Sequence, residues 1–322
     1  MTLIISMLRK FIFLNCICIA FYSCTKSQAN YINQASNSER YNSQVFETIT
    51  VKKDIRYGTN VTQNGKTQGL DLDIYQPAND TETKRPLIIL AHGGSFINGN
   101  KTDLQNFATL LAKAGYVVAS INYRLIDVTP TQLVFKKAVI NAVADMKAAV
   151  RFFTKDAATD NNYKIDPSAI FIGGYSAGAI TALHYAYVHT DSEISAIGGS
   201  TFVNYVNSKG GIDGTSGNSG YPTKIKGVIN ISGALFSKSF INLNEGSLYS
   251  VHGTADQVVP YLQGNINSTG ILTDGSGLLH PQAIQVGLHS ELKTIDNGKH
   301  SAFLNCNSCF VEIRSFLFSQ LK

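Results

Sequence analysis

A short apolar run near the middle of the chain leads into the pentapeptide Gly174-Tyr175-Ser176-Ala177-Gly178, and a helix-forming run follows it. This order predicts a strand, a sharp turn and a helix, with Ser176 on the turn at the edge of a sheet. The two outer glycines leave room for a strained backbone and for close packing of the strand on the helix. Because a glycine-rich turn without any chemistry also fits the pentapeptide alone, its meaning depends on the rest of the chain.

Strand and helix patterns alternate along the chain on both sides of this turn. Continuous apolar runs predict strands buried on both faces, and the earliest strands, with alternating apolar and polar residues, predict an antiparallel edge. The expected strands lie at 45–57, 70–75, 87–91, 116–121, 225–231, 248–252 and 291–295. The expected helices lie at 104–114, 131–156, 177–189 and 309–321. The sequence therefore predicts an α/β fold, with a mostly parallel twisted sheet and helices on both faces.

Two segments interrupt this alternation. Residues 195–224 and 261–280 are rich in glycine, serine and asparagine, and each follows elements that lie close to Ser176 in the expected fold. Loops of this length usually carry function or lack order, and ligands bind at the carboxyl ends of parallel strands. We therefore expect each segment to form a lid or a pocket wall.

An acid and a histidine follow two of the later strands. Asp256 comes after the strand that ends near His252, and His300 lies in a glycine-containing loop after the last strand. A serine hydroxyl needs a base to become a nucleophile, and that base needs an orienting carboxylate. The carboxyl ends of parallel strands share one edge, so Ser176, Asp256 and His300 are expected to meet there as a catalytic triad.

These motifs resemble those of α/β-hydrolases of the carboxylesterase and lipase type, over about residues 85–320. The run His92-Gly93-Gly94-Ser95-Phe96 is similar to the oxyanion-hole motif of the hormone-sensitive-lipase-like esterases, with Ser95 in place of the third glycine. Farther along, Asn122-Tyr123-Arg124-Leu125 and Asp145 also resemble that group.

The resemblance implies an oxyanion hole formed by the backbone N–H groups of Gly94, Ser95 and Ala177. The serine at position 95 keeps a backbone N–H, although which residue of this loop donates stays open. The implied activity is that of a serine hydrolase which cleaves small-molecule or polymeric carboxylic esters through an acyl-enzyme, with no metal and no organic cofactor.

Other functions fit parts of the same sequence pattern. A carbohydrate esterase acting on acetyl or feruloyl groups would use the same residues, and the acyl and alcohol groups are not encoded in the motifs. An exopeptidase of the prolyl-oligopeptidase type shares the order of the triad, but no β-propeller pattern precedes it. A catalytically silent binding protein of this fold would usually lack one member of the triad. A dinucleotide-dependent oxidoreductase is disfavoured because no G-x-G-x-x-G follows a strand.

The start of the chain reads as a targeting segment. Arg9 and Lys10 precede an apolar stretch, 11–22, that is too short to span a bilayer but typical of a signal peptide. The stretch ends just before Cys24 in a pattern that resembles the lipobox of bacterial lipoproteins, where the cysteine is lipidated. Conventional cleavage a few residues later is the alternative.

Three parts of the chain are therefore expected: a signal peptide at 1–23, a tether at 24–44 and an α/β-hydrolase catalytic domain at 45–322. The protein is expected to be exported, either as a lipoprotein of the periplasm or outer membrane, with a membrane tether at its lipidated cysteine, or as a secreted protein.

Cysteine usage and charge agree with an exported protein that binds no nucleic acid. Cys306 and Cys309 are the two cysteines beyond the expected targeting segment, and in an oxidising compartment they are expected to form a disulfide. They do not follow the strand of a thioredoxin-like unit, which disfavours a redox motif. The net charge of +5 is spread over the chain without a basic cluster.

Overall fold

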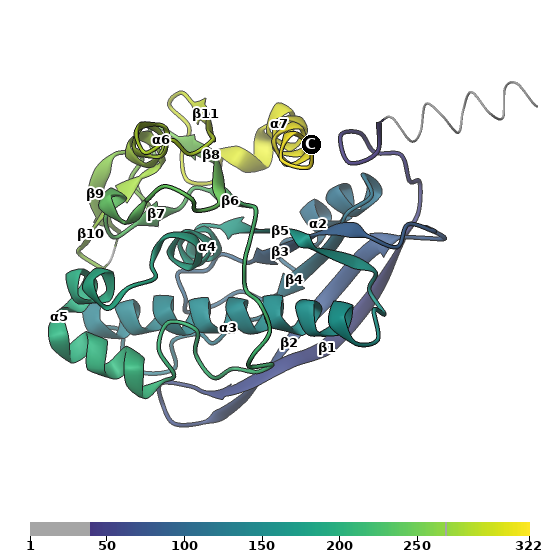
Figure 1. Ribbon diagram of the computed structural model, residues 1–322. Coiled ribbons are helices and arrows are strands. Elements are labelled where there is room, and N and C mark those ends of the chain that lie inside the picture. Colours follow the sequence, from purple (N-terminus) through teal and green to yellow (C-terminus); the bar gives the residue numbers. More distant parts are fainter. Residues whose placement is uncertain (1–38, 268) are drawn as a thin grey trace, which may run out of the picture.

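An eight-stranded sheet runs through the centre of the structure, a computed structural model that describes residues 39–267 and 269–322 (Figure 1). Its strand order is β1-β2-β4-β3-β5-β6-β8-β11. These strands are β1 (Ile49–Val61), β2 (Thr67–Pro77), β3 (Arg85–Ala91), β4 (Val117–Ile121), β5 (Ile165–Tyr175), β6 (Gly227–Ile231), β8 (Ser247–Gly253) and β11 (Ser290–Ile295). Strand β2 pairs antiparallel with β1 and β4, and the other neighbouring pairs are parallel. The predicted α/β fold with an antiparallel edge is confirmed.

Helices cover both faces of this sheet. They are α2 (Gln105–Lys113), α3 (Gln132–Ala158), α4 (Ala177–Tyr187), α5 (Asp191–Ser208), α6 (Ser276–Gln285) and α7 (Asn307–Ser319). In β3, Leu87 and Ile89 pack into the core that contains α3 and α4, whereas Ile88 and Leu90 pack into the core that contains α2 and α7. Because successive side chains of a strand point to opposite faces, a strand between two helical layers must be apolar throughout.

The segment 261–280 is ordered into regular elements. It contains β9 (Gln263–Ile266), β10 (Ile271–Gly275) and the start of α6. Together with β7 (Ala234–Leu235), the two strands form a separate antiparallel sheet in the order β7-β10-β9. This small sheet lies beyond the end of β6 and forms one flank of the molecule in Figure 1.

The segment 195–224 differs from the expected lid. Its first half belongs to α5, which begins after the capping box of Thr190 and Glu193 and is kinked at Gly199, where φ is +75°. Its second half returns to β1, where the N–H of Thr59 donates to the carbonyl of Ser216 at 2.9 Å. The segment therefore packs against α3 and β1.

The first described residues pack against the end of α2. The N–H of Tyr41 donates to the carbonyl of Ala114, and the N–H groups of Val45 and Phe46 both donate to the carbonyl of Lys113. The expected signal peptide at 1–23 and the expected lipidation site at Cys24 lie outside the described residues.

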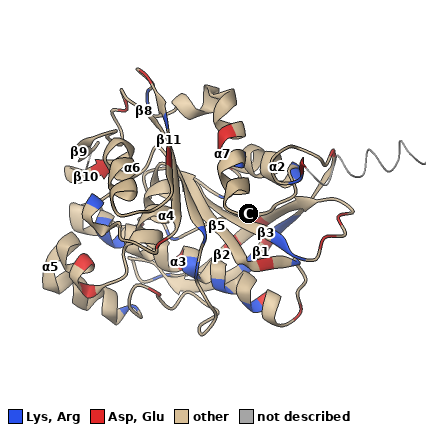
Figure 2. Ribbon diagram, turned by 45° about the horizontal axis from the view of Figure 1, so that its top comes forward, with Lys and Arg blue, Asp and Glu red and all other residues tan. Residues whose placement is uncertain are grey.

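Charges of both signs are interspersed over the helices and strands (Figure 2). Among the described residues, none of the helices has the length and apolar character needed to cross a membrane.

Candidate active site

Strand β5 ends in a sharp turn that presents Ser176. The backbone of Ser176 has φ +54° and ψ −115°, a strained conformation for a residue other than glycine, and α4 begins at the next residue. A Cβ atom on Gly178 would lie 2.0 Å from the carbonyl oxygen of Ala91, and one on Gly174 would lie 2.4 Å from the same atom. Both glycines are therefore required because β3, the turn and α4 touch through their backbones.

His300 bridges Ser176 and Asp256 at the carboxyl edge of the sheet. Its Nε2 lies 2.9 Å from Ser176 Oγ, and its Nδ1 lies 2.7 Å from Asp256 Oδ2. These partners assign the proton to Nδ1, which donates to the carboxylate, and leave Nε2 to accept from the hydroxyl. The carbonyl of His300 accepts from Tyr175 Oη–H and Ser232 Oγ–H, each at 3.2 Å. The structure thus brings together the three side chains selected from the sequence.

The carboxylate of Asp256 is saturated with donors. Its Oδ1 accepts from the N–H groups of Val258 at 2.8 Å and Val259 at 3.0 Å. Its Oδ2 accepts from His300 and also lies 3.2 Å from Nε2 of His252. Burial alone would raise the pKa of Asp256, but the hydrogen bonds from His252, His300 and Val258 together hold that pKa well below its ordinary value. The carboxylate is therefore charged at neutral pH.

The contact of His252 with Asp256 was not predicted from the sequence, where His252 marked only the end of the strand before Asp256. The spacing His252-x-x-x-Asp256 across the end of β8 was the available signal.

The loop after β3 passes directly beside Ser176. A Cβ atom on Gly93 would lie 3.4 Å from Ser176 Cβ. Gly94, Ser95 and Phe96 follow with φ values of +107°, +55° and +60°. At Ser95 this left-handed backbone is strained because the residue has a Cβ atom, whereas the third glycine of the related motif would adopt it freely.

Backbone N–H groups of this region can donate to an anion beside Ser176. Ala177 is the first residue of α4, so its N–H has no partner within the helix. Ala177 and Ser95 both border the cavity next to Ser176. The loop itself is held by Tyr123, whose Oη–H donates to the carbonyl of His92 at 2.8 Å and whose ring stacks on the imidazole.

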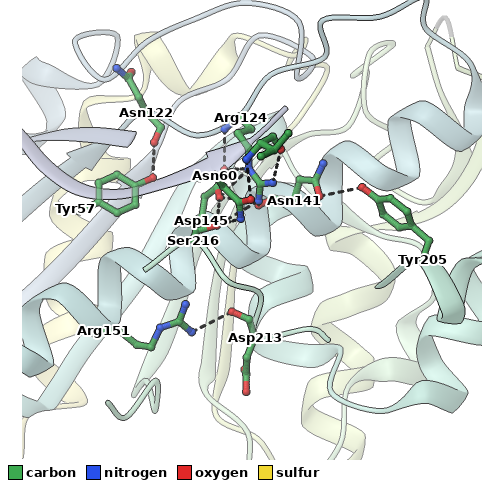
Figure 3. Close-up of polar contacts among 11 residues, drawn as sticks. Tyr57, Asn60, Asn122, Arg124, Asn141, Asp145, Arg151, Tyr205, Asp213 and Ser216 are labelled. Carbon is green, nitrogen blue, oxygen red and sulfur yellow. Dashed lines mark hydrogen bonds and ion pairs between the residues drawn. The ribbon is translucent and has the colours of Figure 1, made fainter. Parts of the chain in front are cut away.

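Arg124 and Asp145 form a buried ion pair (Figure 3). Arg124 Nη2 lies 2.8 Å from Asp145 Oδ1, and the backbone N–H of Arg124 donates to Oδ2 at 2.9 Å. Ser216 Oγ–H donates to the same carboxylate at 2.6 Å. These contacts connect the segment after β4 to α3 and to the segment around Ser216, which packs against β1. The pair therefore supports the site without facing Ser176.

A cavity of about 150 Å³ opens beside Ser176. Its apolar wall is formed by Phe96, Ile126, Phe135, Ile180, Val259 and Ile266. Polar side chains of Thr131, Gln132, Asn267 and Thr269 lie at its border, and none of the described lining residues is charged. The segment 261–280 therefore supplies part of the wall, as expected. The segment 195–224 supplies none of it, and the expectation of a lid there is wrong because α5 packs on α3 instead.

Cys306 and Cys309 are joined by a disulfide at the start of α7, shortly after His300. Among the described residues, no group of three or more His, Cys, Asp or Glu side chains is arranged to hold a metal ion.

Comparison with known proteins finds an esterase family and esterase structures. The family model BD-FAE matches residues 72–235, slightly more than half of the chain. No curated protein matches the sequence.

Three solved structures illustrate the likeness of fold. Esterase 2 of Thermogutta terrifontis, phosphonylated by cyclosarin, is 18% identical, with 85% of this chain and 95% of that chain covered and a TM-score of 0.60. The same esterase with propionate bound gives the same values. A truncated carbohydrate esterase from gut microbiota is 20% identical, with 84% and 96% covered and a TM-score of 0.58. At these identities the structures show a shared fold.

Proposed function

The chain belongs to the BD-FAE family, an esterase domain of the α/β-hydrolase type, and from this premise we propose that it hydrolyses carboxylic esters through an acyl-enzyme on Ser176. The observation that carries the proposal is the continuous chain of hydrogen bonds from Ser176 through His300 to Asp256. This series of hydrogen bonds ends at Ser176, at the mouth of an uncharged cavity.

The proposed reaction has two halves. Ser176 Oγ attacks the ester carbonyl while His300 Nε2 takes the hydroxyl proton, and Asp256 stabilises the imidazolium that forms. The N–H groups of Gly94, Ser95 and Ala177 stabilise the oxyanion, and each donor contributes roughly 3 kcal/mol to transition-state binding. His300 then protonates the leaving alcohol. In the second half it activates a water molecule, which releases the acid from Ser176.

The cavity favours a small, uncharged acyl group. Its volume of about 150 Å³ is similar to that of an engineered protein cavity that binds benzene, so a short aliphatic chain or one aromatic ring fills it. A charged acyl group would lose its hydration there without gaining a partner. The propionate bound to the Thermogutta esterase supports a preference for short chains.

A series of p-nitrophenyl esters from acetate to octanoate tests the proposal. We expect kcat/KM to be highest for acetate to butyrate and to fall for octanoate, and we expect Ser176→Ala to remove turnover while the circular dichroism spectrum stays unchanged. Undiminished hydrolysis by Ser176→Ala would refute the assignment of the nucleophile. A rate that keeps rising up to octanoate would refute the size of the acyl site.

Esters on carbohydrate are a second candidate, favoured by the likeness to the carbohydrate esterase from gut microbiota. The polar border of Thr131, Gln132, Asn267 and Thr269 offers hydrogen bonds to an alcohol group that remains outside the cavity. Acetylated xylan, tested beside p-nitrophenyl acetate, separates the two candidates. A higher kcat/KM on the polysaccharide would identify the alcohol as a sugar, and absence of acetate release would restrict the enzyme to small esters.

We also propose that the protein is exported and anchored through a lipid on Cys24. The charged and apolar residues before this cysteine and the disulfide between Cys306 and Cys309 support export. Expression in a bacterial host with labelled palmitate tests the anchor. We expect label in the wild-type protein and none in Cys24→Ser, whereas an unlabelled wild-type protein would indicate conventional cleavage.

A further inference from the structure

Three buried polar side chains form a second layer behind Asp256 that the reaction above does not use. Asn230 lies in β6, His252 in β8 and Ser276 at the first residue of α6, and each of them is completely buried. His252 Nδ1 lies 2.8 Å from Ser276 Oγ, which lies 3.0 Å from Asn230 Nδ2. A continuous polar chain therefore runs from Asn230 to Asp256.

The direction of each hydrogen bond in this chain follows from its inner end. Asn230 Oδ1 accepts from the N–H of Gly233 at 2.9 Å, so its amide nitrogen must face Ser250 and Ser276 and donate to both. Ser276 Oγ accepts that bond, and among the described residues its other hydrogen-bond neighbour is His252 Nδ1, so the hydroxyl proton goes to Nδ1. The proton of the neutral imidazole must then be on Nε2.

The outer end of the chain leads independently to the same tautomer. His252 Nε2 faces two acceptors, the carbonyl of Val259 at 3.1 Å and Oδ2 of Asp256 at 3.2 Å. An unprotonated Nε2 would place three lone pairs against one another in a fully buried site. A proton on Nε2 is donated to the carbonyl of Val259 and also lies beside Asp256 Oδ2.

We propose that His252 is a positioning residue for the triad, held by Asn230 and Ser276 as the Nε2–H tautomer so that it fixes Asp256 Oδ2 in line with His300. The inference rests on the proposed function, because it assigns a role within the same site. The titratable side chains that face His252 and Asp256 are those of His300, Tyr175 and Tyr261, the last with its ring 5.6 Å from the imidazole of His252.

Loss of the Nε2–H donor of His252 has two expected consequences. The carboxylate is less firmly held against rotation, so the imidazole of His300 is oriented for a smaller fraction of the time and kcat falls. The negative charge of Asp256 is also shared among fewer donors, which strengthens its attraction for the protonated form of His300. The acidic limb of the kcat/KM profile therefore moves to higher pH. Because His252 does not line the cavity, KM is expected to stay unchanged.

A matched pair of variants of the full chain tests the role of the donor. The amide nitrogen of Gln in His252→Gln can occupy the position of Nε2, whereas the shorter Asn in His252→Asn reaches only the position of Nδ1. We expect His252→Asn to lower kcat about tenfold and to shift the acidic limb upward, and His252→Gln to recover most of both. Equal losses in the two variants would overturn the proposal and indicate that the imidazole is needed only for packing.

Histidine nitrogen NMR spectra supply a readout that does not depend on turnover. In the wild-type protein and in Ser176→Ala, we expect His252 to be the neutral Nε2–H tautomer. In Ser276→Ala, which removes a single hydroxyl, we expect Nε2–H to stay the major tautomer, because Val259 and Asp256 still face Nε2, and we expect a measurable Nδ1–H fraction, because the inner partner is lost. A wild-type Nδ1–H tautomer would overturn the proposal even if the enzyme hydrolyses esters. If Ser176→Ala stays active, the proposed function fails, while the tautomer still decides the arrangement of His252.

Discussion

The buried pair of Arg124 and Asp145 gives a stability prediction whose size follows from its contacts. Asp145 is fully buried and accepts from the backbone and guanidinium of Arg124 and from Ser216. The side chain of Arg124 is 3% exposed. Asp145→Ala removes the carboxylate and leaves a guanidinium in the interior without its counter-charge. Breaking a buried pair in this way costs about 3–5 kcal/mol.

The double variant Arg124→Met/Asp145→Ala removes both charges, and its cost should be lower than the sum of the single costs. It will not be zero, because Arg124 also donates to the carbonyls of Val61 and Asn141, each at 3.0 Å. An acceptor left unpaired in the interior costs about 1–3 kcal/mol. We expect a coupling free energy of at least about 2 kcal/mol between the two positions.

Urea unfolding followed by circular dichroism measures these differences at neutral pH. The pair of Arg56 and Asp71 is the matched control, since its side chains are 58% and 28% exposed, and Arg56→Ala should cost less than about 1 kcal/mol. If Asp145→Ala lowers the free energy of unfolding by no more than Arg56→Ala does, the reasoning from burial is wrong. If Asp145→Ala does not fold, the double variant alone still tests whether removing the stranded charge restores folding.

Further predictions concern the site and its pH dependence. Asp256→Asn should lower kcat by about four powers of ten, because the amide favours the wrong tautomer of His300, and a loss of only a few-fold in ester hydrolysis would point to another carboxylate. Gly178→Ala should prevent a stable fold or remove ester hydrolysis, since its Cβ would overlap the carbonyl oxygen of Ala91, and normal melting with normal activity would contradict this. Burial lowers the pKa of His184 to about 4, and an unfolded histidine takes up its proton near pH 6.5, so the unfolded state binds more protons between these values. The wild-type protein should therefore lose about 3 kcal/mol of stability, relative to His184→Gln, as pH falls from about 6.5 to 4 in urea titrations, and equal losses in both proteins would contradict the assignment.

Much of the fold could be predicted because the physical signals were local. A strand between two helical layers must be apolar at every position, and the continuous run in β3 has this property. The same logic predicted where the reactive side chains meet, since β5, β8 and β11 are parallel strands whose carboxyl ends share one edge. The catalytic roles of Ser176, Asp256 and His300 stay predictions.

The composition of the segment 195–224 predicts a loop, although its first half is helical. Gly198 and Gly199 lower the helix propensity of α5 and allow the kink at Gly199, so the segment resembles a loop. The capping box of Thr190 and Glu193 was the one local signal that a helix begins there.

The contact of His252 with Ser276 could not be predicted from spacing. Which atoms meet across the end of β8 depends on the turn that follows it and on Ser276, which arrives from α6. Contacts of this kind between distant segments are set by tertiary packing, and no local sequence pattern predicts them.

Because β11 lies at the edge of the sheet, we expect heating to abolish activity before it unfolds the rest of the domain. This strand pairs with β8 alone among the described strands and is only half-buried along its length. Edge elements fray at a lower free energy than central ones. In the proposed reaction, we expect each such opening to carry the imidazole of His300 away while β3 and β5 remain packed, so that thermal inactivation begins in molecules that bulk spectroscopy still records as native.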